Sequence, residues 1–212
     1  MVLIPKYSSS FQKRMFDLLV GTTLLLCAIP VLLLVGITIL LATGWPILYS
    51  QQRLGKNKQV FTLYKFRSMR VGAENQQKQL SKINIAPTPM FKLEKDPRFT
   101  SIGYYLSHTG IDELPQLINV LKNDMSLVGP RPLPIAEGKA LKDDWSWRWQ
   151  VKPGLFSYWV LSPDRYQSLE KWKQLEKKTV QITNPHVDGI LMLTILKRQI
   201  LSLAHYFPNI FQ

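Results

Sequence analysis

The sequence predicts an α+β protein, mainly helical with a small β-hairpin, that has an N-terminal re-entrant membrane helix and interfacial amphipathic helices. Three observations support this class. Residues 18–52 contain no charged side chain, and residues 47–69 place aromatic and β-branched residues on both sides of a turn. Residues 114–121 and 189–204 repeat apolar side chains at helical spacing.

The first expected element is a membrane helix in the apolar residues 18–42. As a helix these 25 residues extend roughly 37 Å, enough for a bilayer core of about 30 Å. Pro30 interrupts the hydrogen-bond ladder near the centre, so the segment either crosses with a kink or bends at Pro30 and returns to the same side. Basic residues mark cytoplasmic flanks, and both flanks are basic, which favours the re-entrant form. The flanking residues are Lys6, Lys13 and Arg14 before the segment and Arg53, Lys56 and Lys58 after it. A cleaved signal peptide is a third reading, but no clear small-x-small site is present.

The charge balance favours anionic partners. The chain carries 27 basic and 14 acidic residues, a formal net charge of +13, and no acidic residue lies between Asp17 and Glu74. Lipid headgroups, phosphorylated substrates and nucleic acid all fit this charge, and the membrane segment makes nucleic acid the weakest of the three. The single cysteine, Cys27, excludes an internal disulfide, and the histidines show no metal-ligand spacing, so any metal should prefer oxygen ligands.

A β-hairpin is expected over residues 47–69, with its turn at 55–58. Side chains alternate along a strand, so Lys65 and Arg67 should share one face. That face is either a phosphate-binding surface or a solvated basic strand.

The following segments are less informative. Residues 72–95 are polar without periodicity and predict a mobile loop. Asp96-Pro97 is typical of a turn. Four tryptophans, at 145, 147, 149 and 159, belong either to the bilayer interface or to a small core. Two helices are predicted over 169–178 and 189–204.

Residues 112–132 carry the chemistry. Pro115 lacks an N–H and fits the first turn of a helix, which makes Asp112 the expected N-cap. There the helix dipole would keep a carboxylate ionised, able to bind a metal or attack phosphorus, although Asp followed by Glu113 is also ordinary cap chemistry. Arg131 lies between two prolines that restrict its backbone, and a guanidinium held in this way can grip a phosphate.

Taken in order, the motifs resemble the bacterial sugar transferase family, the monotopic polyprenyl-phosphate phosphoglycosyl transferases, in their small catalytic form. The resemblance covers residues 11–160. It rests on KRMFD at 13–17, QRLG at 52–55, KFRSM at 65–69, DPRFT at 96–100, the whole of 112–132 and KPG at 152–154.

The resemblance implies transfer of a phosphosugar from a UDP-sugar to polyprenyl phosphate with release of UMP. Asp112 would be the covalent nucleophile, and Glu113 would lie beside it as a partner that organises Mg²⁺ or handles a proton. Phosphate and substrate would contact the residues Lys65, Arg67, Gln116, Gly129, Pro130 and Arg131.

The resemblance also implies a place in the cell. Residues 1–44 would form a monotopic anchor in the inner membrane and residues 45–212 a catalytic domain at its cytoplasmic face, starting a capsule, exopolysaccharide or O-antigen. Membrane lipids are expected partners, nucleic acid is not, and a homo-oligomer is possible.

The chain departs from the family pattern at several positions. Ser107 and Tyr104 replace commonly basic residues, Ile29 precedes Pro30 where Ser is frequent, and Phe156-Ser157 replaces Thr-Gly. These departures leave a second hypothesis open, a catalytically weak or silent membrane scaffold that recruits glycosyltransferases.

Overall fold

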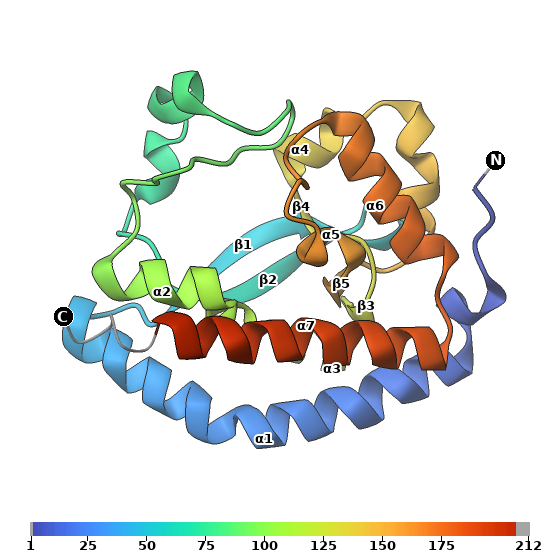
Figure 1. Cartoon of the computed structure of the whole chain (residues 1–212), viewed down its shortest axis with the longest axis horizontal. Coiled ribbons are helices and arrows are strands. Elements are labelled where there is room, and N and C mark those ends of the chain that lie inside the picture. The colour runs from blue at the N-terminus through green and yellow to red at the C-terminus, as the bar shows by residue number, and fades with distance from the viewer. Residues whose placement is uncertain (1, 207–212) are drawn as a thin grey trace.

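A computed structural model of the chain describes residues 2–206. Seven α-helices and five strands occur in this range (Figure 1). The helices are α1 (Phe11–Thr43), α2 (Ser101–Thr109), α3 (Gln116–Leu121), α4 (Ile135–Lys139), α5 (Tyr158–Leu161), α6 (Leu169–Gln181) and α7 (Pro185–Tyr206); the strands are β1 (Leu48–Leu54), β2 (Val60–Phe66), β3 (Ser126–Val128), β4 (Leu133–Pro134) and β5 (Gly154–Phe156). The α+β, mainly helical class is confirmed.

The predicted hairpin is confirmed as β1 and β2, which pair antiparallel from Leu48 opposite Phe66 to Leu54 opposite Val60. Asn57 and Lys58 adopt positive φ in the turn that joins the strands. The short β4 adds to β1, giving a three-stranded sheet with the order β2-β1-β4. A second, parallel pair of β3 and β5 was not predicted, because each strand is only three residues long.

The helix α1 is one unbroken element with Pro30 inside it. Ser10 caps its start by accepting the Lys13 N–H at 3.1 Å, and Gly44, at φ 73°, ends it. Figure 1 shows α1 bowed, with its middle lying farthest from the rest of the chain. The two helix ends are buried against the domain, through Gly21 near the start and Ile39 near the end, whereas no residue from 22 to 34 is buried.

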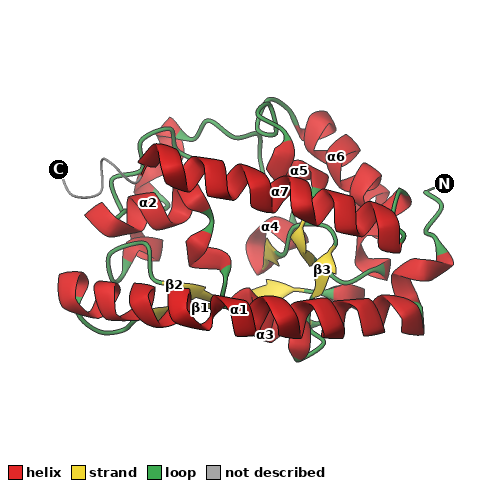
Figure 2. Ribbon diagram, turned by 60° about the horizontal axis from the view of Figure 1, so that its bottom comes forward, coloured by secondary structure: helices red, strands yellow, loops and turns green. Residues whose placement is uncertain are grey.

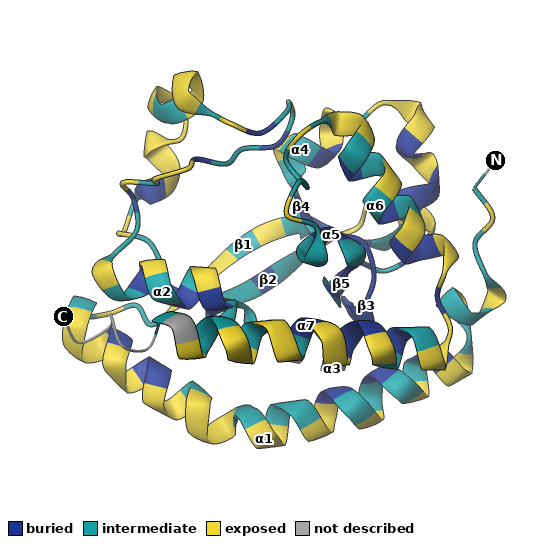
Figure 3. Cartoon of the chain, in the orientation of Figure 1, coloured by how far each residue is buried: buried dark blue, intermediate teal, exposed yellow. Residues whose placement is uncertain are grey.

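The domain has three apolar clusters. The four tryptophans at 145, 147, 149 and 159 lie in the first of them together with Trp172, which is fully buried, and Trp145 stacks on Trp147 with ring centroids 5.9 Å apart. These residues therefore build a core. The second cluster joins α3, β3 and α7, and the third joins the end of α1 to Phe66 and Leu106 (Figure 3).

The two predicted C-terminal helices are α6 and α7, each longer than expected. Figures 1 and 2 together place α7 and α1 on one face of the domain. Apolar side chains of α7 are exposed on its outer surface, at Ile190, Leu193, Ile200 and Leu201. Residues 72–95 form two short 3₁₀ turns joined by irregular chain, and their predicted mobility stays a prediction, as does the domain boundary after residue 44.

Candidate active site

A cavity of about 510 Å³ lies between β2, α2, α5 and α7, within the range of roughly 300–1,000 Å³ typical of small-molecule sites. Four of the predicted site residues line it, namely Lys65, Glu113, Gln116 and Arg131. Further cations come from other elements, in the residues Arg53, Lys92, Arg98, Arg165 and Arg198. The cavity is therefore suited to a ligand that carries several negative charges.

The predicted helix start at Asp112 is wrong. Gly110, at φ 77°, ends α2, and a single 3₁₀ turn follows over Ile111–Glu113, with the Glu113 N–H donating to the Gly110 carbonyl at 3.1 Å. The next helix, α3, starts at Gln116, and its N-cap is Pro115. Asp112 therefore caps no helix. The position of Pro115 correctly indicated that a helix begins nearby. It could not show that α2 ends just before Asp112, which places Asp112 in the turn between the two helices.

Asp112 is buried, with 4% of its surface exposed. Burial raises the pKa of this carboxyl to about 7, assisted by the nearby Glu113 charge and opposed by Lys65. The ionising effect expected from a helix dipole is therefore absent, and desolvation sets the direction of the shift. A buried carboxylate with few solvating waters is a more reactive nucleophile toward phosphorus once it is ionised.

Glu113 differs from its neighbour because it forms an ion pair with Lys65, whose Nζ lies 2.5 Å from Glu113 Oε1. Burial alone would raise the pKa of Glu113, but the hydrogen bond and charge of Lys65, with the charges of Arg131 and Arg53, lower it below its ordinary value. Adjacent carboxyls with pKa values displaced in opposite directions divide the work of an active site. Glu113 therefore stays ionised over the pH range near 7 in which Asp112 gains or loses its proton.

Arg131 is fixed by contacts to both its backbone and its side chain. Its N–H donates to Glu176 Oε1 at 3.1 Å, and its carbonyl accepts a hydrogen bond from Arg148. Glu176 and Arg148 are themselves a fully buried ion pair. The Arg131 guanidinium lies 4.8 Å from the centre of the Trp159 ring. A buried charge network thus adds to the restriction of the Arg131 backbone that the flanking prolines were predicted to impose.

Four of the residues predicted for catalysis or phosphate binding do not line the cavity: Asp112, which is buried next to the lining residue Glu113, and Arg67, Gly129 and Pro130. Arg67 donates to the Thr43 and Gly44 carbonyls at 2.9 and 2.7 Å, so it holds the end of α1. It lies one residue beyond β2, which ends at Phe66, so strand alternation does not place it beside Lys65. Gly129 and Pro130 are buried, and they line a different pocket. A Cβ on Gly129 would meet the Lys152 carbonyl at 2.5 Å, so this glycine permits close backbone packing.

Paired variants can test this separation of Lys65 from Arg67. Arg67→Met should lower the free energy of unfolding by about 1–3 kcal/mol, because buried carbonyls lose their donor, while the activity of the folded protein is kept. Lys65→Met should leave the melting temperature almost unchanged, because its ion pair is partly exposed, and should lower kcat/KM roughly 100-fold. Thermal unfolding and steady-state kinetics on both variants provide the test. Loss of activity without loss of stability in Arg67→Met would contradict the assignment.

The carboxylates suit Mg²⁺ only if the substrate also contributes ligands. Within residues 2–206 no cluster of three or more His, Cys, Asp and Glu side chains could hold a metal. Mg²⁺ commonly takes one or two carboxylates together with substrate phosphates, and Asp112 and Glu113 offer that pair. A cation here would also offset the cost of ionising the buried Asp112.

Several residues of the site were missed by sequence reasoning. Arg53 lines the cavity, donates to the Pro132 carbonyl at 2.9 Å and has its pKa lowered to about 10 by burial and by Arg131. Arg98 lines the cavity in a two-point ion pair with Asp96, where only a turn was expected. Both residues belong to the recognised motifs, which was the available signal. Nothing in the sequence pairs Glu176 with Arg148.

Comparison with known proteins decides the family. The family model described as bacterial sugar transferase matches residues 8–200. The chain belongs to the bacterial sugar transferase family. The match extends the resemblance beyond residue 160, through α6 and most of α7.

Similarity to individual proteins supports the same family assignment. The chain is 41% identical over 182 residues to a galactosyl transferase, CpsE, of Streptococcus agalactiae, covering 84% of this chain and 39% of that protein. It is 38% identical over 167 residues to an undecaprenyl-phosphate galactose phosphotransferase of Salmonella typhimurium, covering 75% and 34%. It is 34% identical over 155 residues to the exopolysaccharide production protein ExoY of Sinorhizobium fredii, covering 71% and 69%. The chain therefore spans less than half of the first two relatives.

Proposed function

We propose that this chain is a polyprenyl-phosphate sugar-1-phosphate transferase. In the first step an Asp112 carboxylate oxygen attacks the β-phosphorus of a UDP-sugar, and the bond to the bridging oxygen breaks to release UMP. In the second step a phosphate oxygen of polyprenyl phosphate attacks the same phosphorus. The acyl phosphate bond breaks, the Asp112 carboxylate is restored, and the sugar leaves on a lipid diphosphate.

The observation that carries this proposal is a buried carboxyl beside a cavity rich in cations. A diphosphate brings negative charge to Asp112, and the repulsion must be offset for attack to occur. Arg131 and Arg53 lie on the cavity wall, and Lys65 lies next to Glu113. These side chains would bind the phosphoryl oxygens and the departing UMP. Mg²⁺ held by Asp112, Glu113 and the substrate would neutralise further charge.

The first step is expected to depend on pH and on Mg²⁺ together. Asp112 must be ionised to attack, and burial raises its pKa to about 7, so the rate should rise with pH through that value. Mg²⁺ stabilises the ionised form and should move the midpoint to lower pH. Single-turnover UMP release without polyprenyl phosphate measures this step free of the acceptor's own titration. A midpoint that does not respond to Mg²⁺ would contradict a metal bound at Asp112.

We further propose that α1 is a re-entrant helix and that the domain lies at the cytoplasmic face of the inner membrane. The support is that both helix ends are attached to one domain. Near its start, Arg14 donates to the carbonyls of Val120 and Leu121 at 2.8 and 2.9 Å; at its end, Arg67 holds Thr43 and Gly44. A helix held at both ends by one domain has both ends on the same side of the membrane. The helix α7, which carries exposed apolar side chains, lies on the same face of the domain as α1 (Figure 2).

Cysteine labelling tests this topology. Phe11 is the first residue of α1 and Trp45 lies two residues beyond its end, and both are exposed. In a Cys27→Ser background, Phe11→Cys and Trp45→Cys should each react with a membrane-impermeant thiol reagent only from the cytoplasmic side. Opposite sidedness of the two positions would establish a crossing helix.

The proposed reaction is tested by UMP release from purified protein with polyprenyl phosphate, Mg²⁺ and a panel of UDP-sugars. Release with one sugar would establish the activity and its donor. The lipid-linked sugar would then start an exopolysaccharide or a related surface glycan, in keeping with the name of the exopolysaccharide production protein from Sinorhizobium. Silence across the panel with folded protein would favour the scaffold hypothesis. Ser107 lines the cavity, so Ser107→Arg is then the variant to test for recovered activity.

A further inference from the structure

A second pocket, of about 120 Å³, lies behind the segment that carries Arg131. Gly129 and Pro130 line it, whereas Arg131 and Pro132 line the catalytic cavity. One water molecule needs ~10–15 Å³ of such space, so the pocket can admit a group as large as phosphate. The first residues of α1 form another wall.

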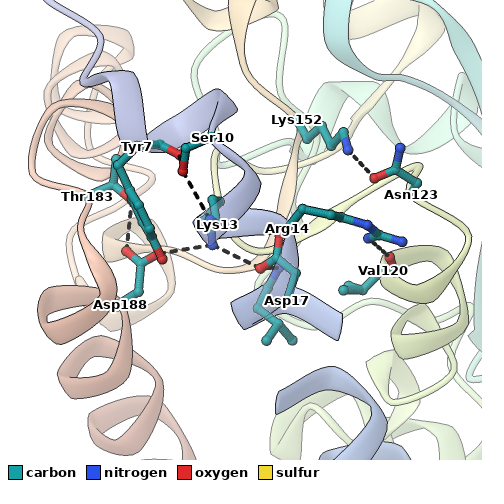
Figure 4. A network of polar contacts seen from close by, with 11 residues as sticks. Tyr7, Ser10, Lys13, Arg14, Asp17, Val120, Asn123, Lys152, Thr183 and Asp188 are labelled. Atoms are coloured by element: carbon teal, nitrogen blue, oxygen red, sulfur yellow. Dashed lines mark hydrogen bonds and ion pairs between the residues drawn. The ribbon is translucent and has the colours of Figure 1, made fainter. Parts of the chain in front are cut away.

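The wall formed by α1 is a closed ion-pair network. Lys13 Nζ lies 2.9 Å from both Asp17 Oδ1 and Asp188 Oδ2, between α1 and α7 (Figure 4). Asp17 Oδ1 also accepts the Leu127 N–H at 3.0 Å. All three side chains are buried, and Thr183 Oγ1 also donates to Asp188 Oδ1 at 2.9 Å, so two carboxylates share one ammonium. The network fixes the start of α1 on the domain, and the pocket lining carries other charges besides it.

Those other charges are all positive. Arg14, Lys56 and Lys152 line the pocket, and Asp17 is the only acidic side chain of its lining. Arg14 donates to main-chain carbonyls and Lys152 to the side-chain amide of Asn123, so neither has an anionic partner within residues 2–206 (Figure 4). Burial, Arg14 and Lys56 together lower the pKa of Lys152. Mutual repulsion of this kind is relieved by a bound anion.

A buried hydroxyl points to the same ligand. Ser126 lines the pocket and is 4% exposed, and its Oγ has no hydrogen-bond partner in the described part of the chain. A buried hydroxyl without a partner is costly, and such groups are rare in folded proteins. The Ser126 hydroxyl can donate to an anion oxygen that Lys56 and Lys152 also contact.

We propose that this pocket binds a phosphate group, and that the group belongs to the headgroup of an anionic phospholipid. The pocket lies at the start of α1, where the charged residues of the chain give way to the apolar segment. Phe11, Met15 and Leu19, in the first turns of α1, are exposed. Basic residues at such a boundary attract acidic headgroups. The site would attach the back of the Arg131 segment to the membrane surface.

Lysine acylation on the full chain in neutral detergent tests the proposal, read by peptide mass spectrometry. The probes are short-chain phosphatidylglycerol, inorganic phosphate and short-chain phosphatidylcholine. Phosphatidylglycerol at ten times its dissociation constant should slow acylation of Lys56 and Lys152 roughly tenfold, because about a tenth of the pockets stay free. Lys58, in the same turn, and Lys65, in the catalytic cavity, should react at unchanged rates.

Two variants separate binding from folding. Ser126→Ala should weaken phosphatidylglycerol binding about tenfold, since one hydrogen bond to a charged group is lost. Its melting temperature without ligand should be unchanged or higher, because the removed hydroxyl has no partner. Lys56→Gln should weaken binding to a similar extent, and Lys58→Gln, its matched control, should not.

Each remaining outcome would overturn part of the proposal. Unchanged acylation of Lys56 and Lys152 with both anions, or full affinity in Ser126→Ala, would refute the site. Protection by inorganic phosphate alone would refute the lipid and leave a site for free phosphate. Equal protection by phosphatidylcholine would refute the preference for an anionic headgroup.

Discussion

Asp112→Asn is expected to reduce UMP release roughly 10⁴- to 10⁶-fold, the loss seen when a covalent nucleophile is removed. The amide keeps the shape of the side chain but cannot attack phosphorus. The fold should be at least as stable as that of the original chain. The pKa of Asp112 is raised in the folded protein, so its ionised form destabilises the fold at neutral pH.

The pH dependence of unfolding gives this variant an independent check. An unfolded aspartate titrates near pH 4, and the folded one near 7. The melting temperature of Asp112→Asn relative to the original chain should therefore rise between about pH 4 and 7 and stay level above. Asp124→Asn, which removes a half-buried carboxylate from the turn after α3, is the matched control. Near-normal UMP release by Asp112→Asn would sink the nucleophile assignment.

Glu176→Ala is expected to cost about 3–5 kcal/mol of stability, the usual result of removing one member of a buried ion pair. Arg148 would keep its charge in a site where it is 2% exposed. The Arg131 N–H would also lose its acceptor. Denaturant unfolding should show the midpoint falling while the slope is kept.

A double variant separates the two roles of this network. Replacing both charges with apolar residues, in Arg148→Met with Glu176→Leu, should restore most of the stability, since no unpaired charge stays buried. It would not restore the contacts that hold both sides of the Arg131 peptide. We therefore expect kcat/KM to stay well below that of the original chain. Full recovery of both stability and activity would show that the network acts on folding alone.

The sequence predicted the features that depend on local pattern. The hairpin followed from alternating aromatic and β-branched residues around a turn, and α6 and α7 from apolar spacing, as the structure confirms. Lys65, Glu113, Gln116 and Arg131 were expected in one site, and all four line one cavity. Their roles in catalysis remain predictions.

The sequence could not supply features set by tertiary contact. Asp112 was expected to be exposed and stabilised as an anion, whereas burial between packed elements raises its pKa. Arg67 was placed on the same face as Lys65 because strand alternation was extended one residue past the end of β2, and its side chain instead holds the end of α1. The pairing of Glu176 with Arg148 joins residues 28 apart, which no local pattern reveals.

The measurement that tests the account most directly is mass spectrometry of the intact protein and of its peptides after incubation with the UDP-sugar donor and Mg²⁺, without polyprenyl phosphate. The account predicts a phosphosugar adduct on the peptide that contains Asp112, formed together with UMP and lost when polyprenyl phosphate is added. The adduct should be absent from Asp112→Asn. Donor turnover that requires both substrates at once, with no adduct at any time, would contradict the covalent route.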